Sequence, residues 1–124
     1  MSEIRATTIS DSAGTGPITL TKQAAVRAYV SFDNASTATI EESLNIASIT
    51  DLAAGETQVN LSNNMSSSEY CIVASAGRTT SGGSPGMQWM YAPTASKWQH
   101  ETMSNSSTYM DADNNYSAAF GDLA

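Results

Sequence analysis

Cysteine, histidine and basic residues are scarce in this sequence of 124 residues. It has one cysteine, one histidine, and five lysine or arginine residues against twelve acidic residues, which gives a net charge of −7. A single cysteine excludes an internal disulfide. The shortage of basic residues excludes the positive stripe that nucleic-acid binding requires and disfavours binding to anionic lipid. No apolar run approaches about 18 residues, so the sequence predicts no membrane span.

A secretion signal and a catalytic histidine motif are also missing. Residues 1–5 lack the basic-then-apolar pattern of a signal peptide, so we expect synthesis in a reducing cytoplasm. Residues 82–86 (GGSPG) match the letters Gly-x-Ser-x-Gly, but they lie in a loop rich in glycine and serine, not on the strand-to-helix turn of a nucleophile elbow that could accompany His100. Glu41 and Glu42 are adjacent, and neighbours on a strand point to opposite faces, which excludes them as a carboxylate pair across a sugar. We therefore predict no enzymatic activity and no cofactor.

One acidic segment resembles the opening of a calcium loop. Asp111, Asp113 and Asn115 follow the Asp-x-Asp-x-Asn pattern, but Tyr116 stands where that loop needs a glycine. An Asx-rich turn before the last strand is the simpler interpretation. We predict no metal site, with calcium as the open alternative.

Polar uncharged residues and short alternating segments are abundant. Charged residues make up 14% of the chain, against about 25% in typical domains, while serine and threonine number 19 and 14. Apolar and polar residues alternate over residues 26–32 and 57–61, as on half-buried strands. The register breaks near residues 47–48, where we predict a bulge or bend. Residues 70–74 are apolar on both faces and predict a central, doubly covered strand with Cys71 buried.

The spacing of these segments predicts an all-β fold. We expect an antiparallel β-sandwich or jelly-roll-like domain over residues 24–124, with further short strands near residues 87–91, 108–110 and 116–120. Residues 1–23 contain a Gly- and Pro-bearing stretch and little that can bury itself, so we expect an extended arm that lies on a partner. Its candidate partner-binding residues are Ile4, Arg5, Ile9, Ile18 and Leu20.

Large aromatic side chains gather between residues 87 and 98. Trp89, Tyr91 and Trp98 could form a stacking platform for a sugar, with serine and asparagine loops supplying hydrogen bonds. Large aromatics more often fill a core or a subunit interface, and we favour that interpretation for Trp89 and Tyr91.

Four segments resemble a domain found in tail-fibre-like proteins of marine bacteriophages. Residues 27–33 (RAYVSFD) resemble its opening strand, and residues 43–51 (SLNIASITD) resemble its Ser-Phe-Asn-Val-Ser-Ser-Ile-Thr-Asp segment. Residues 56–61 (ETQVNL) and 70–75 (YCIVAS) are similar to the strands that follow. The similarity covers residues 20–76 well and the last third weakly. Asn34 stands where that family usually has glycine, and Glu41 lies where it often has a basic residue.

The resemblance implies a structural role in a virion and supplies no catalytic residues. We expect a non-enzymatic bacteriophage protein on the particle surface, made in the host bacterial cytoplasm, as a capsid decoration or a fibre-like component. Its expected partners are further copies of itself, as a homotrimer by family analogy, and a major capsid, tail or adaptor protein. The alternative is a short tail-fibre adhesin that binds a host-surface glycan.

Overall fold

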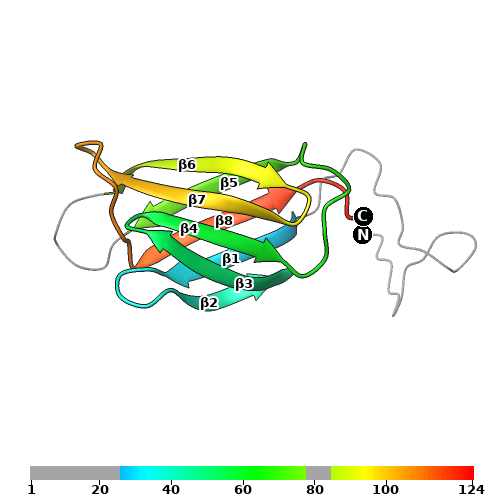
Figure 1. Cartoon of the computed structure of the whole chain (residues 1–124), viewed down its shortest axis with the longest axis horizontal. Coiled ribbons are helices and arrows are strands. Elements are labelled where there is room, and N and C mark those ends of the chain that lie inside the picture. Colours follow the sequence, from blue (N-terminus) through cyan, green and yellow to red (C-terminus); the bar gives the residue numbers. More distant parts are fainter. Residues whose placement is uncertain (1–25, 78–84) are drawn as a thin grey trace, which may run out of the picture.

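The chain folds as two antiparallel four-stranded sheets packed face to face. The computed structural model describes residues 26–77 and 85–124, and Figure 1 shows the two layers. The first sheet has the order β2-β1-β8-β5, with β1 at Val26–Asp33, β2 at Thr39–Leu44, β8 at Asn114–Phe120 and β5 at Cys71–Gly77. The second has the order β3-β4-β7-β6, with β3 at Ile46–Ala53, β4 at Glu56–Leu61, β7 at Lys97–Ser104 and β6 at Pro85–Thr94. The predicted all-β sandwich is confirmed.

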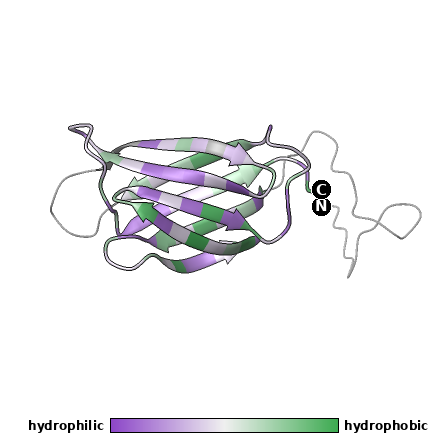
Figure 2. Ribbon diagram, viewed as in Figure 1, coloured by the Kyte–Doolittle hydropathy of each residue, from purple (hydrophilic) through white to green (hydrophobic). Residues whose placement is uncertain are grey.

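Alternating side chains from both sheets build one core between the layers. Figure 2 shows hydrophilic and hydrophobic residues alternating along the strands. The buried apolar residues of this core are Ala28, Val30, Phe32, Val59, Leu61, Met65, Trp98 and Ala119. Burial of each large apolar side chain stabilises the fold by about 1.5–3 kcal/mol. The alternation predicted over residues 26–32 and 57–61 is confirmed by burial except at Val26, which is 39% exposed where the register of β1 against β8 shifts.

The chain passes from the first sheet to the second at Asn45. This residue has a φ of 58°, a conformation that asparagine tolerates better than most residues. Its side-chain Oδ1 accepts hydrogen bonds from the backbone N and the Nδ2 of Asn63, at 2.8 and 3.0 Å. The register of β3 against β4 then shifts between Ile46 and Ser48. The predicted bulge is present, and the sheet change beside it is a feature that the pattern did not predict.

The segment predicted as a central strand is an edge strand. β5 pairs only with β8 at the end of the first sheet, among the described strands. Cys71 is exposed, and Val73 is 52% exposed. The prediction of a doubly covered strand was wrong because Tyr70 and Ile72 pack against the core, while Cys71 and Val73, which alternate with them, point outward.

Two further predictions concern chain segments outside regular strands. The short strand expected at residues 108–110 is a single bridge between Met103 and Tyr109. Residues 1–23, predicted as an arm, lie outside the described residues. No helix long and apolar enough to cross a membrane occurs in residues 26–77 and 85–124.

Candidate binding surfaces

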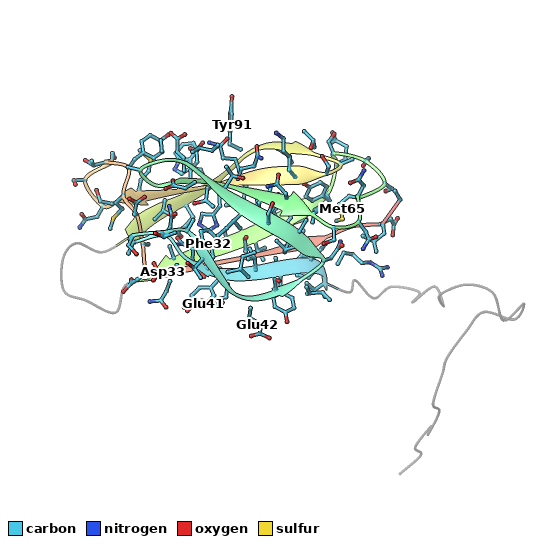
Figure 3. The ribbon with its side chains drawn as sticks, turned by 60° about the horizontal axis from the view of Figure 1, so that its bottom comes forward. Phe32, Asp33, Glu41, Glu42, Met65 and Tyr91 are labelled. Carbon is cyan, nitrogen blue, oxygen red and sulfur yellow. The ribbon has the colours of Figure 1, made fainter. Side chains whose placement is uncertain are left out.

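The outer face of the second sheet presents two aromatic side chains. Trp89 is 55% exposed and Tyr91 is 62% exposed, and both project from β6 on the side away from the core. Figure 3 shows Tyr91 standing clear of the sandwich, on the opposite side from Glu42. Two residues apart on one strand, their Cα atoms are about 6.5–7 Å apart. The register places Glu101 opposite Trp89 and Gln99 opposite Tyr91 on β7.

The polar residues beside these aromatics are held by hydrogen bonds to one another. Gln99 Nε2 donates to Glu56 Oε2 at 3.3 Å and to Glu101 Oε1 at 3.2 Å. The hydroxyl of Tyr109 donates to Glu101 Oε2 at 3.1 Å. That bond, together with the negative charge of Glu101, raises the pKa of Tyr109. We call Trp89, Tyr91, Gln99, Glu101, Glu56 and Tyr109 the aromatic face.

The outer face of the second sheet also carries a row of hydrogen-bonded polar side chains, which runs from β7 across β4 to β3. Lys97 Nζ donates to Gln58 Oε1 at 2.8 Å, and Gln58 Nε2 donates to Asn60 Oδ1 at 2.8 Å. Asn60 Nδ2 reaches Ser48 Oγ at 3.1 Å. These bonds order side chains that would otherwise sample many rotamers, so the outer surface is polar and partly fixed.

Trp98 does not belong to this surface. Its side chain has no exposed area, and it packs edge-on against Tyr70 with ring centroids 6.4 Å apart. Because β7 alternates, residues 97, 99 and 101 face out while Trp98 faces the core. The predicted glycan platform of Trp89, Tyr91 and Trp98 is therefore wrong in its third member. Of the preferred interpretation for Trp89 and Tyr91, the core does not hold because both are exposed, and the subunit interface stays a prediction.

The outer face of the first sheet is less polar and carries a groove. A hollow of about 420 Å³ lies over β1, β8 and β5, with Glu42 of β2 on its rim. Its larger lining side chains are Tyr29, Tyr116 and Val73. One row of cross-strand neighbours runs over this sheet as Leu44, Tyr29, Ala118 and Val73. We call these four residues the apolar row.

Glu41 and Glu42 both lie on this outer face, contrary to the sequence prediction. Ser31 Oγ donates to Glu41 Oε2 at 2.8 Å, and the Tyr29 hydroxyl donates to Glu42 Oε1 at 3.0 Å. Figure 3 shows both carboxylates on one side of the sandwich. The register of β1 against β2 shifts between Ser31 and Phe32, and this irregularity cancels the alternation. The hydrogen bond from Tyr29 also raises the pKa of that tyrosine.

The only histidine is sealed in the core. His100 is 1% exposed and stands edge-on to Phe32, with ring centroids 5.3 Å apart. Burial lowers its pKa from 6.5 to about 4, so the ring is neutral at pH 7. Neither ring nitrogen has a hydrogen-bond partner among the described residues. This histidine is a packing residue and has no access to a substrate.

The side chains of the calcium-like segment, residues 111–115, form hydrogen bonds with other parts of the protein. Asp111 Oδ1 accepts hydrogen bonds from the backbone N of Gly55 at 2.7 Å and from Asn34 Nδ2 at 3.2 Å. Asn115 is buried, and its Nδ2 donates to the carbonyl oxygen of Ala112 at 2.7 Å. Within the part of the chain that the structure describes, no group of three or more histidine, cysteine or acidic residues is placed to hold a metal ion. The bond from Asn115 to Ala112 is local, whereas those of Asp111 join this segment to Asn34 and to the β3–β4 turn.

The predicted arm residues Ile4, Arg5, Ile9, Ile18 and Leu20 lie outside the described residues. Comparisons with family models, with curated proteins and with solved structures found no match to this chain.

Sequence reasoning missed most members of both surfaces. Gln99, Glu101 and Glu56 come together only through the β4–β7–β6 register, and residues 95–104 show no clear alternation in the sequence. Tyr29 was assigned to the outward side of its strand, which the structure bears out. Tyr29 shares one row with Val73 and Leu44 because the strand order is β2-β1-β8-β5. Local sequence pattern does not predict strand order.

Proposed function

We propose that this protein is a non-enzymatic structural component displayed on the surface of a bacteriophage particle, as a capsid decoration or a short fibre-like component. The resemblance of residues 20–76 to tail-fibre-like phage domains supports the phage setting. A single sandwich with two broad outer faces suits a module that works by contact with other molecules.

The observation that carries the proposal is the apolar row. Leu44 is 47% exposed and Val73 is 52% exposed, and both lie in line with Tyr29 and Ala118 across the whole first sheet. Single exposed apolar residues are ordinary, but a contiguous group on one face indicates an interaction surface. We infer that this face is covered by another copy of the chain, with a homotrimer as the assembly that family analogy favours.

The hollow beside the row strengthens the inference. Tyr116, 45% exposed, stands over it next to Ser31 and Ser75 in the cross-strand register. Exposed tyrosines with an apolar ring and a polar tip are favoured at protein interfaces. The acidic rim at Glu42 gives such an interface a polar border.

Residues 1–22 supply the attachment to the particle in this proposal. All the core residues in the described part of the chain belong to residues 28–119, so a chain that starts at residue 23 keeps every one of them. We expect the truncated protein to unfold cooperatively at nearly the wild-type temperature and to fail to join particles that lack the protein. Truncated protein that still decorates those particles in the wild-type copy number would refute the attachment role.

A further inference from the structure

The aromatic face of the second sheet carries an inference that is independent of the apolar row. It combines exposed flat rings, fixed polar groups and local negative charge, and each of these features limits the chemical class of ligand that can bind. The proposed role in the particle does not require any of them.

Trp89 and Tyr91 offer two ring surfaces on one side of β6. Trp89 is 55% exposed and Tyr91 is 62% exposed. Each ring therefore leaves a large apolar area in contact with water. Pyranose rings have apolar C–H faces that pack on aromatic rings, and a spacing of about 6.5–7 Å is on the scale of neighbouring sugar units. A chain of sugars along β6 would contact both rings.

The polar groups beside the rings match the hydroxyl groups of a sugar. Each carboxylate oxygen of Glu56 and Glu101 has two lone pairs, so a hydrogen bond to Gln99 or Tyr109 leaves acceptor capacity for a ligand hydroxyl. Because Gln99 bridges both carboxylates, these groups are already positioned before a ligand arrives. Binding to preorganised groups costs less side-chain entropy than binding to free ones.

The charge of the face selects among glycan classes. Glu56 and Glu101 lie side by side in the β4–β7 register, and their two negative charges outnumber the one positive charge of Lys97, whose ammonium donates to Gln58 on the same face. The whole chain carries a charge of −7. Sulfated or uronic-acid glycans would meet like charge here, whereas neutral glycans would not.

We propose that the aromatic face binds neutral hexose oligosaccharides, with Trp89 and Tyr91 as stacking residues and Gln99, Glu101 and Glu56 as hydrogen-bonding residues. A second copy of the chain is a poorer occupant, since two such faces would bring four carboxylates together. The apolar row on the opposite side is better suited to self-association.

The experiment measures binding of the full chain to neutral glucan, mannan and galactan oligosaccharides of three to six units, and to sulfated and uronic-acid oligosaccharides of equal length. Wild type should bind at least one neutral series, and Trp89→Ala should weaken that binding about ten-fold or more. Tyr116→Ala is the matched control, because it removes an exposed aromatic from the opposite face, and its binding to a single oligosaccharide, measured per chain, should equal that of wild type whatever its oligomeric state. Glu101→Gln should weaken binding while leaving the oligomeric state unchanged.

Tryptophan fluorescence adds a second readout. Trp98 is buried and Trp89 is exposed, so a ligand on the aromatic face should shift the red-edge emission of wild type and leave that of Trp89→Phe nearly unshifted.

The proposal is overturned by binding to no neutral series, by binding confined to anionic glycans, or by neutral binding that Trp89→Ala preserves and Tyr116→Ala abolishes. A change of oligomeric state in Trp89→Ala would assign the face to self-association instead. None of these results bears on attachment to the particle, which the truncation tests.

Discussion

The interior and the outer surfaces of this sandwich use the same residue types for different purposes. Trp98 has no exposed area, whereas Trp89 on the neighbouring strand is 55% exposed. The β6–β7 register pairs Trp89 with outward-facing Glu101, while Trp98 occupies an inward position of β7. Aromatic content alone therefore says little about binding, and the position of each ring relative to the core decides its role.

The two outer faces also differ from each other. The first sheet presents the apolar row beside a hollow of about 420 Å³, and the second presents paired aromatics beside carboxylates and amides. An apolar surface gains most from a protein partner that excludes water, whereas fixed hydrogen-bonding groups beside rings suit a hydroxylated ligand. We therefore propose neighbouring copies of the chain as the partner of the first face and a glycan as the ligand of the second.

The largest expected effect separates the two tryptophans. Trp98→Ala should lower the free energy of unfolding by about 3–5 kcal/mol, because it leaves a cavity in the core. Trp89→Ala should change that free energy by only about 0.5 kcal/mol, because the residue is largely in water. Urea unfolding followed by circular dichroism measures both, and equal losses for the two variants would contradict the assignment of inside and outside.

The second effect concerns pH and the interior. The unfolded chain takes up a proton on His100 near pH 6.5, but the folded chain resists it until about pH 4. The free energy of unfolding should therefore fall as pH drops from 6.5 to 4, by up to about 3 kcal/mol from this residue. His100→Leu should flatten that part of the curve. An identical pH dependence of unfolding in the variant and in wild type would show that the imidazole is not buried as described.

A third, smaller effect distinguishes two glycines. Gly55 has a φ of 71°, and a Cβ there would lie 2.4 Å from the carbonyl oxygen of Thr102. Gly55→Ala should lower the free energy of unfolding by about 2 kcal/mol or more. Gly77→Ala is the control, because its Cβ would lie no closer than 3.8 Å to the nearest neighbouring atom, Asn114 Cβ. Thermal unfolding of both variants tests the difference, and comparable losses would contradict the described β3–β4 turn.

The smallest expected change in the free energy of unfolding comes from a substitution in the apolar row. Val73→Glu should change the free energy of unfolding by about 0.5 kcal/mol or less, since Val73 is half exposed. It should nevertheless dissociate the self-assembled protein, because a buried unpaired charge is costly at an interface. Thr50→Glu on the second sheet is the matched control. Light scattering gives the mass of each variant, and a Val73→Glu protein that assembles like wild type would remove the row from the interface.

Period-two patterning predicted the sandwich because alternation is a local property of strands. Residues 28–32 and 57–61 fall inside and outside as their sequence indicates, and the register break at Ile46–Ser48 is present. Local pattern failed where strand order decides burial. Tyr70 to Ala74 look equally apolar on both sides, yet no other described strand covers the outer face of β5, which leaves Val73 and Cys71 in water.

The candidate surfaces were less predictable than the fold. Trp89 and Tyr91 were identified from their residue types, but the exclusion of Trp98 required the register of β7. Glu41 and Glu42 were assigned to opposite faces on the assumption of regular alternation, and one irregularity between Ser31 and Phe32 brought them together. Long-range pairing and bulges are set by tertiary packing, so single-strand pattern contains little information about them.

Immunogold labelling of intact particles tests the proposed display on a virion surface most directly. Antibodies against the folded chain should label the outside of unbroken particles, in a copy number that is a multiple of the oligomer found in solution. Gold confined to the cell debris, or labelling that appears only after the particles are opened, would contradict display on the virion surface.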